Sequence, residues 1–177
     1  MSMLIPIKLA TLMGLTALLQ GITPAAGYQH DLSDYVDTNG DTRPRVFRGR
    51  NVFGMDDPLP MLSILEEPRP EWGFAPEFSG LGAGPWPLFV QGFVQDDPTN
   101  PTDPAHYLMA DVKKCLALHL KAALGSGNIF GVGRAVRSYK IATGVVRPPD
   151  DVSAMANFFL PLTLEFFEDM TSPFAYP

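Results

Sequence analysis

The chain has a single cysteine, Cys115, so it can form no intrachain disulfide and no cysteine-based zinc finger. Charge is scarce as well, because Asp, Glu, Lys and Arg make up only 18% of the 177 residues. The formal net charge of -6 argues against sequence-independent binding to phosphate backbones. A chain of this length suits one domain with a real core. So little charge is typical of a protein that covers part of its surface with partners.

Catalytic motifs are also missing. The three histidines lack the spacing of a zinc protease, and no serine lies in a G-x-S-x-G sequence. Residues 37–41 resemble the start of a calcium loop, but Thr42 and Arg48 stand where an EF-hand needs Gly and Glu, so we interpret them as an Asx-rich turn. Residues 125–130 nearly match a dinucleotide fingerprint, but they end in Phe130 and follow a predicted helix. We therefore predict no enzyme, no cofactor and no metal site.

Acidic residues occur as three adjacent pairs, each near a proline: Asp56-Asp57, Asp96-Asp97 and Asp150-Asp151. Converging carboxylates can hold a divalent metal for phosphoryl chemistry, which leaves a metal-dependent hydrolase as an alternative. No His or Lys accompanies the pairs in matching positions. We therefore interpret them as turn formers on solvated rims.

Residues 3–22 are strongly apolar, and a buried N-terminal helix is predicted by five residues at helical spacing: Ile5, Leu9, Leu12, Thr16 and Leu19. Residues 24–27 resemble a signal-peptidase site, which leaves a secreted binding protein with a cleaved signal as an alternative. The only cation, Lys8, lies inside the apolar run, whereas a signal peptide carries its positive charge ahead of that run. Pro6 and several polar residues also make the segment a poor membrane span.

Residues 23–45 are predicted to form a loop, residues 46–52 a short strand with Arg48 and Arg50 on one face, and residues 61–65 a second strand. Residues 66–85 hold four prolines and four glycines, which predicts one long loop. This loop carries Trp72, Phe74 and Phe78, and leaving three large aromatic side chains in water is unfavourable. They either fold back onto the subunit or anchor a neighbour, and the low surface charge favours the neighbour.

Residues 88–94 are predicted to form a core strand, residues 96–101 a turn, and the following residues a helix. Thr102 or Asp103 can cap this helix, and Pro104 suits its first position. One apolar stripe is predicted along it: Leu108, Val112, Cys115, Leu116, His119 and Ala123. Asp111, Lys114 and Lys121 are expected on the solvent side. We expect Cys115 to be a small buried hydrophobe and His119 to be a core histidine without a ligand.

Residues 136–146 are predicted to form another strand. The clearest strand follows, because its alternate residues form one apolar face: Phe158, Leu160, Leu162, Leu164 and Phe166. Pro161 cannot donate to a ladder, so this strand is expected at an edge or with a bulge. Phe159 and Phe167 suggest that its other face is also partly covered.

The element order predicts an α+β domain at residues 1–169 and a short C-terminal tail at 170–177. The domain should have a mostly antiparallel sheet with the N-terminal and central helices on one face and long loops.

The order of these segments resembles the tail terminator (tail completion) proteins of long-tailed bacteriophages, over residues 5–169. The motifs that carry the resemblance are structural turns and strands, in this order: Gly27-Tyr28, Val46-Phe47-Arg48-Gly49-Arg50, Asp56-Asp57-Pro58-Leu59-Pro60, Leu62-Ser63-Ile64-Leu65-Glu66, Val90-Gln91-Gly92-Phe93-Val94, Pro101-Thr102-Asp103-Pro104-Ala105, Val146-Arg147-Pro148-Pro149-Asp150 and Glu168-Asp169. The aromatic loop and the C-terminal tail match no pattern of the family.

The resemblance implies a structural virion protein, made in the host cytoplasm, that assembles six-fold into a ring on the head-proximal end of the tail tube. Its expected partners are other copies of the chain, the major tail tube protein and a neck or head-completion (connector) protein. DNA is expected to pass through the lumen without specific binding, and no membrane is involved. Another neck or head–tail joining protein is the nearest alternative. The residues expected at partner interfaces are Trp72, Phe74, Phe78, Arg48, Arg50, Asp96, Asp97, Asp150 and Asp151.

Overall fold

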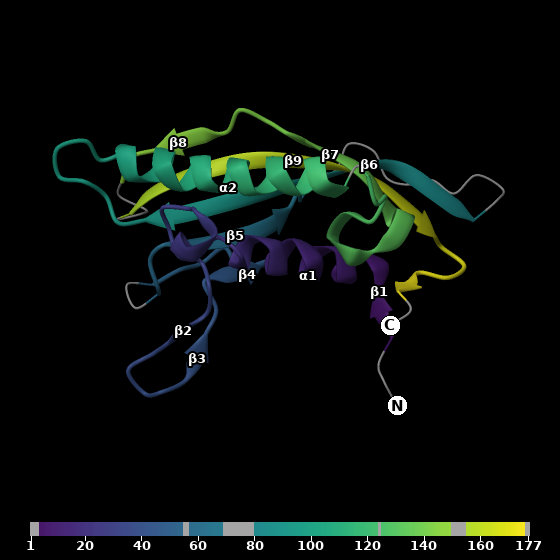
Figure 1. Ribbon diagram of the computed structural model, residues 1–177, viewed down its shortest axis with the longest axis horizontal. Coiled ribbons are helices and arrows are strands. Elements are labelled where there is room, and N and C mark those ends of the chain that lie inside the picture. Colours follow the sequence, from purple (N-terminus) through teal and green to yellow (C-terminus); the bar gives the residue numbers. More distant parts are fainter. Residues whose placement is uncertain (1–3, 55–56, 69–79, 124, 150–154, 176–177) are drawn as a thin grey trace.

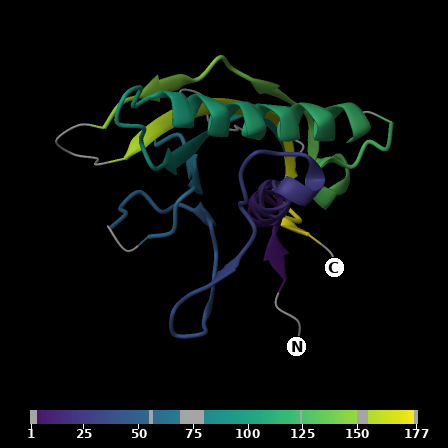
Figure 2. The same cartoon turned by 60° about the vertical axis from the view of Figure 1, so that its left-hand side comes forward.

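The protein is described from a computed structural model that covers residues 4–54, 57–68, 80–123, 125–149 and 155–175. It confirms the predicted α+β class, since one mixed, mostly antiparallel sheet carries two long helices on one face (Figure 1). The view turned by 60° shows helix α2 from the side along the sheet and helix α1 nearly end-on below it, so the two helices cross at a large angle (Figure 2).

The main sheet has the order β4 (Val46–Arg48), β5 (Met61–Glu66), β6 (Leu81–Val94), β9 (Ala156–Asp169) and β7 (Val136–Ile141), and β8 (Val145–Arg147) also pairs with β9. Only β4 and β5 run parallel. The helices are α1 (Ile7–Gln20) and α2 (Asp103–Ala123), with short 3-10 turns η1 (Pro24–Ala26), η2 (Ile129–Gly131) and η3 (Gly133–Ala135). Two small two-stranded sheets pair β1 (Ile5–Pro6) with β10 (Phe174–Ala175) and β2 (Tyr35–Val36) with β3 (Thr42–Arg43).

The predicted apolar face of β9 is confirmed, because its five residues are fully buried: Phe158, Leu160, Leu162, Leu164 and Phe166. They form one core with the stripe of α2, in which Leu108, Val112, Cys115 and Leu116 are also buried. Helix α2 begins at Asp103, and the backbone carbonyl of Thr102 accepts the N–H of His106 at 3.2 Å. Thr102 therefore occupies the N-cap position. The burial of Cys115 agrees with the expectation of a small hydrophobe.

Strand β9 was expected at an edge or with a bulge, and the edge was wrong, since β9 lies between β6 on one side and β7 and β8 on the other. The register shift in its ladder with β7 lies between Val136 and Ser138 of β7, away from Pro161. Pro161 faces the break between β7 and β8, where its carbonyl oxygen accepts the N–H of Ala142 at 3.0 Å. The strand predicted at 136–146 is divided into β7 and β8 at this break. The missing N–H of Pro161 removes no ladder bond, because the partner strand is interrupted there.

The predicted loop at 66–85 was wrong at its C-terminal end, because residues 81–85 belong to β6 and pair with β9. Prolines are tolerated here because β5 ends at Glu66, which leaves this part of β6 paired only with β9. The carbonyl of Pro87 accepts the N–H of Glu67 at 3.2 Å. The backbone nitrogen of Pro87, which carries no hydrogen, therefore also faces away from β9, and no bond to β9 is lost. Residues 69–79 lie outside the described residues.

The predicted N-terminal helix is confirmed as α1, but its expected apolar stripe is only partly right. Ile5 lies in β1, and Leu9 is 41% exposed, because the helix begins after Pro6 and turns Thr11, Leu15 and Leu19 inward. The buried hydroxyl of Thr11 donates to the carbonyl of Ile7 at 2.9 Å, which satisfies it inside the core. No helix within the described residues combines the length and the apolar character that crossing a membrane requires.

Short strands also occur in the predicted loop at 23–45 and in the C-terminal tail. The loop at 23–45 contains the β2–β3 hairpin, which projects from the body of the domain (Figure 1). In the C-terminal tail, β10 pairs with β1, so this part of the tail contacts the N-terminal segment.

Gly14 determines how closely α1 approaches η2. A Cβ at this position would lie 2.1 Å from the carbonyl oxygen of Phe130, whose backbone has φ +56°. Gly14→Ala should therefore destabilise the protein by about 1–3 kcal/mol, although Ala is the better helix former. Gly84→Ala is the matched control, because a Cβ there meets nothing within 4 Å. Urea unfolding of both variants measures the difference, and equal stabilities would show that the α1–η2 contact is not tight.

Candidate interaction surfaces

Five of the nine residues predicted at partner interfaces lie outside the described residues: Trp72, Phe74, Phe78, Asp150 and Asp151. Their place at an interface stays a prediction. The other four are Arg48, Arg50, Asp96 and Asp97. Their hydrogen-bond partners place them at three different parts of the subunit.

The two arginines do not share a face, so that expectation was wrong. The strand predicted at 46–52 ends at Arg48, because Gly49 adopts φ +67° and turns the chain. Arg48 lies on the helix side of the sheet, where its Nη1 donates to Thr16 Oγ1 of α1 at 3.1 Å. Arg50 instead forms an ion pair with Asp57, in which Nη2 lies 2.6 Å from Oδ1.

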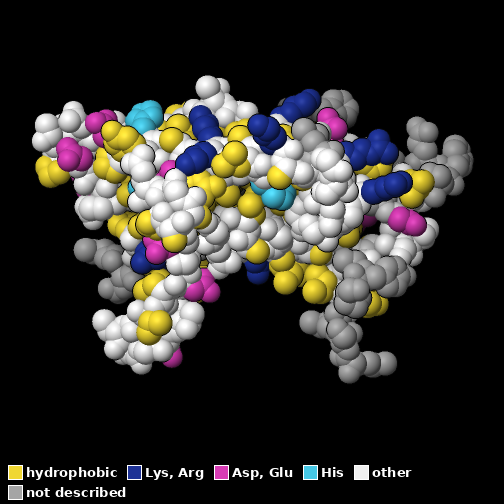
Figure 3. All heavy atoms as spheres, viewed as in Figure 1, with side chains coloured by type: hydrophobic (Ala, Val, Ile, Leu, Met, Phe, Trp, Pro, Cys, Tyr) yellow, Lys and Arg dark blue, Asp and Glu magenta, His cyan; other side chains and the backbone are white. Residues whose placement is uncertain are grey.

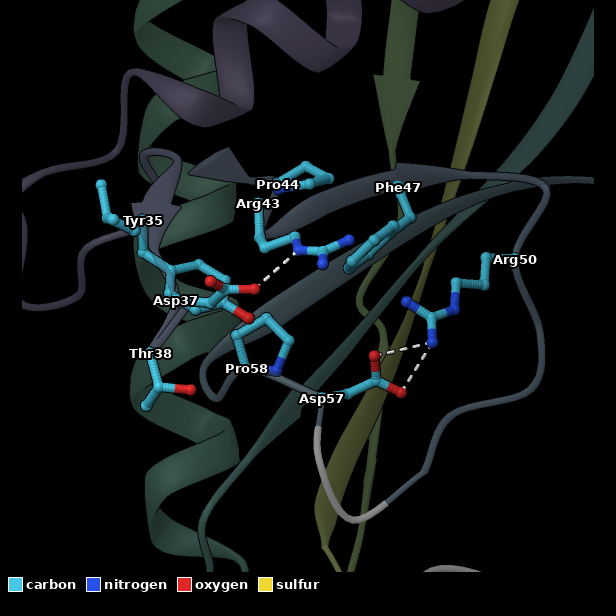
Figure 4. A pocket seen from close by; sticks show the side chains of 10 residues that line it. Tyr35, Asp37, Thr38, Arg43, Pro44, Phe47, Arg50, Asp57 and Pro58 are labelled. Carbon is cyan, nitrogen blue, oxygen red and sulfur yellow. Dashed lines mark hydrogen bonds and ion pairs between the residues drawn. The ribbon is translucent and has the colours of Figure 1, made fainter. Parts of the chain in front are cut away.

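Arg50 lines a hollow of about 720 Å³ between the β2–β3 hairpin and the first strands of the sheet (Figure 4). Its guanidinium group lies 4.6 Å from the ring centroid of Phe47 and 4.8 Å from that of Phe53. On the hairpin side of the hollow, Arg43 Nε donates to Asp37 Oδ2 at 2.9 Å. The hollow therefore combines two Arg–Asp pairs with aromatic surface. Each guanidinium group already has a carboxylate partner. The hollow would therefore bind a ligand through its shape and its apolar surface more than through an unpaired charge.

Asp37 organises the turn of the hairpin. Its Oδ1 accepts the backbone N–H groups of Asn39 at 2.9 Å and Asp41 at 3.0 Å, so the predicted Asx-rich turn is confirmed. The hydrogen bond from Arg43, followed by those from the backbone, lowers the pKa of the Asp37 carboxyl.

The acidic pair after β6 also organises a turn. Asp97 Oδ1 accepts the N–H groups of Thr99 at 2.8 Å and Asn100 at 2.7 Å, and Asp96 Oδ1 accepts Gln95 Nε2 at 2.7 Å. The interpretation of Asp97 as a turn former is thus confirmed. Across the described part of the chain, no three His, Cys, Asp or Glu side chains gather closely enough to hold a metal ion.

A second hollow, of about 370 Å³, lies beside this turn. It is lined by Asp97 and Asn100 from the turn, by Asp103 and Tyr107 from the start of α2, and by His30 from the loop after α1. The side chain of Tyr107 is 55% exposed. An exposed aromatic ring beside two carboxylates is a surface that can receive a partner's side chain.

Asp111 was predicted on the solvent side of α2, and this was wrong, because it is only 5% exposed. Its Oδ2 accepts the N–H groups of Gln29 and His30 at 2.9 and 3.0 Å and lies 2.8 Å from His30 Nδ1. It therefore ties the loop after α1 to α2. The sequence could have predicted this burial, since Asp111 follows Leu108 by three residues and precedes Cys115 by four, which places it beside the apolar stripe.

His119, Phe130 and Tyr139 form a stack of rings near the C-terminal half of α2. The His119 and Phe130 centroids are 5.1 Å apart with 7° between the planes, and His119 Nδ1 lies 3.2 Å from the Tyr139 hydroxyl. That hydroxyl donates to the carbonyl of Leu116 at 2.6 Å. Burial lowers the pKa of His119 and raises the pKa of Tyr139. His119 is thus a packed histidine at the margin of the core, as its place on the apolar stripe predicted.

The face of the sheet opposite the helices carries half-buried aromatic residues, among them Phe89 on β6 and Phe159 and Phe167 on β9. The partial cover predicted for Phe159 and Phe167 is confirmed. The guanidinium carbon of Arg137 lies 4.0 Å from the Phe167 ring centroid, and that of Arg147 lies 5.8 Å from Phe159. Aromatic and arginine side chains are enriched where proteins meet. We call this surface the open sheet face.

No protein-family model matches the chain, and no curated protein matches it at a significant level of sequence similarity. A function can therefore be inferred only from these surfaces, the fold and the order of the sequence motifs.

Asp111→Ala is expected to lower the free energy of unfolding by about 3 kcal/mol, because the two backbone N–H groups and the His30 ring lose the buried acceptor that holds the loop. Asp111→Asn keeps one acceptor oxygen, so its free energy of unfolding should fall by less. The control is His106→Ala, an exposed position on the same helix that should change stability by less than about 0.5 kcal/mol. Denaturant unfolding followed by circular dichroism measures all three. Equal losses in Asp111→Ala and His106→Ala would mean that Asp111 does not hold the loop.

Stability should also depend on pH through His119. Because burial lowers its pKa in the folded state, the unfolded chain takes up the proton first as the pH falls below 6.5. The contribution of neutral His119 is therefore complete above this pH and declines below it. His119→Gln removes the titrating group, so its stability should fall less than that of the wild type between about pH 7 and pH 5. Denaturation curves at a series of pH values test this, and identical pH profiles would rule it out.

Proposed function

We propose that the chain is a tail terminator of a long-tailed phage, a structural virion protein that forms a ring of six copies on the head-proximal end of the tail tube. The ring ends polymerisation of the tube and offers a surface for the neck. Its partners are further copies of the chain, the major tail tube protein and a neck or head-completion protein. In this role the protein is not an enzyme.

The observation that carries the proposal is the order of turn and strand motifs over residues 5–169, together with their place on one α+β domain. Most of these motifs lie in strands of the main sheet, namely β4, β5, the end of β6, β8 and the end of β9, and one lies at the start of α2. The resemblance therefore follows the framework of the fold.

The surfaces of the subunit support assembly. A ring subunit needs a different contact surface for each of its two neighbours, and further surfaces for the tube and the neck. The described residues offer the open sheet face, the hollow beside Arg50 and the hollow beside Asp97. The aromatic residues and arginines on them suit protein contacts.

The polar clusters also support a structural role. The carboxylates of Asp37, Asp57, Asp97 and Asp111 bind arginines, turn amides or a loop histidine. Within the described residues no serine, threonine or cysteine side chain hydrogen-bonds to a histidine, as a nucleophile and its base would. The net charge of -6 suits a ring through which DNA passes without adhering.

Electron microscopy of the purified protein with tail tubes tests the proposal. We expect rings on one end of each tube, and tubes capped in this way should not elongate when tube subunits are added. The isolated protein can remain monomeric before it meets a tube, since a ring that closed early would fail to dock. A protein that stays monomeric and never binds a tube end would refute the proposal.

A further inference from the structure

The charges of the chain are segregated along the sequence. Residues 112–149 contain seven of the 13 Lys and Arg residues and none of the 19 Asp and Glu residues. The structure distributes these cations over α2, η3 and the edge strands β7 and β8, and Figure 3 shows Lys and Arg gathered along this side of the molecule. We call them the basic strip: Lys113, Lys114, Lys121, Arg134, Arg137, Lys140 and Arg147.

The basic strip has no carboxylate partner among the described residues; His30, Arg43 and Arg50 are the cations of the ion pairs that join two described side chains. Two of its lysines donate to backbone carbonyls, and two of its arginines lie on phenyl rings. Lys121 and Lys140 are exposed. Cations on an edge strand discourage aggregation, which accounts for Lys140 on β7 but not for Lys121 on α2.

The hollow beside Asp97 has the opposite character. Asp97 and Asp103 provide two carboxylates, Tyr107 provides an exposed ring, and no Lys or Arg is among the described residues that line it. Carboxylates next to an aromatic ring form a suitable environment for a guanidinium or ammonium group. We call this the acidic hollow.

Lys121, at the far end of the basic strip, cannot neutralise the acidic hollow of its own subunit. Asp103 and Lys121 lie at opposite ends of α2, about 27 Å apart at the rise of an α-helix. Charges are screened over about 8 Å at physiological ionic strength. An opposite charge supplied by another molecule would therefore stabilise each of these two groups most.

We infer that a basic side chain from the strip of one copy enters the acidic hollow of the next copy, and that this contact joins neighbours in the ring. The inference rests on the proposed function. The partner is a second copy because the two surfaces are complementary in charge and lie at different places on the same chain. Such a head-to-tail contact can close into a ring, whereas a two-fold contact of the strip with itself would oppose cation to cation.

Two charge reversals test the contact. Asp103→Lys alters the hollow, and the double variant Lys121→Glu, Lys140→Glu alters the strip. Each variant alone should raise the protein concentration needed for half-maximal capping of tail tubes at least about tenfold. An equimolar mixture should assemble again, because the reversed strip of one variant matches the reversed hollow of the other and the copies can alternate around an even-numbered ring. Recovery on mixing also shows that both variants are folded.

Asp34→Lys is the matched control, since it reverses an exposed carboxylate that is not among the residues lining either hollow and should assemble like the wild type. If both reversed variants cap tubes normally, or if mixing restores nothing, the inference is wrong while the ring proposal stands. If the wild type itself never caps a tube, both the proposed function and this inference are wrong. If the strip variant caps normally but no longer retains a duplex DNA probe, the strip serves nucleic acid and the inference is overturned.

Discussion

Strands β6 and β9 pair over 14 residues each, from Leu81 opposite Asp169 to Val94 opposite Ala156, without a register shift. Because side chains alternate along a strand, this register places the apolar residues of both strands on the same face. A slip by one residue would turn the buried set of β9 toward solvent, and each of its large side chains contributes about 1.5–3 kcal/mol through burial. Gly92 helps to fix the register, since a Cβ there would lie 2.1 Å from the ring of Phe158 opposite.

The helices follow from this ladder. The fully apolar face is covered by α1 and α2, and the middle of the other face carries half-buried aromatic residues such as Phe89 and Phe159. At the β4–β5 end that second face is covered by the segment after β4, where Phe53 contacts Phe93 with ring centroids 4.8 Å apart. The sheet is thus fully buried on one face and partly covered on the other, which agrees with a subunit that meets other proteins.

Elements whose pattern lies within a single segment were predictable. The alternation in β9, the apolar stripe of α2 and the turn at 37–41 each depend on neighbouring residues, and each was confirmed. Features set by distant partners were not predictable. Pro161 is tolerated inside the sheet because β7 and β8 part opposite it, and Pro85 and Pro87 are tolerated because β5 ends early. Neither circumstance can be read from the sequence around these prolines.

The same distinction holds for the candidate surfaces. Asp97 was predictable as a turn former, whereas the burial of Asp111 depends on a loop that is 82 residues distant in sequence. Asp111 holds Gln29 and His30, which line the acidic hollow together with Asp97 and Tyr107. A buried carboxylate that stabilises the fold thus also fixes one wall of the surface proposed to meet a neighbouring copy. Because the wall is held by three hydrogen bonds to one carboxylate, the hollow is preorganised, and its occupant need not order the loop when it binds.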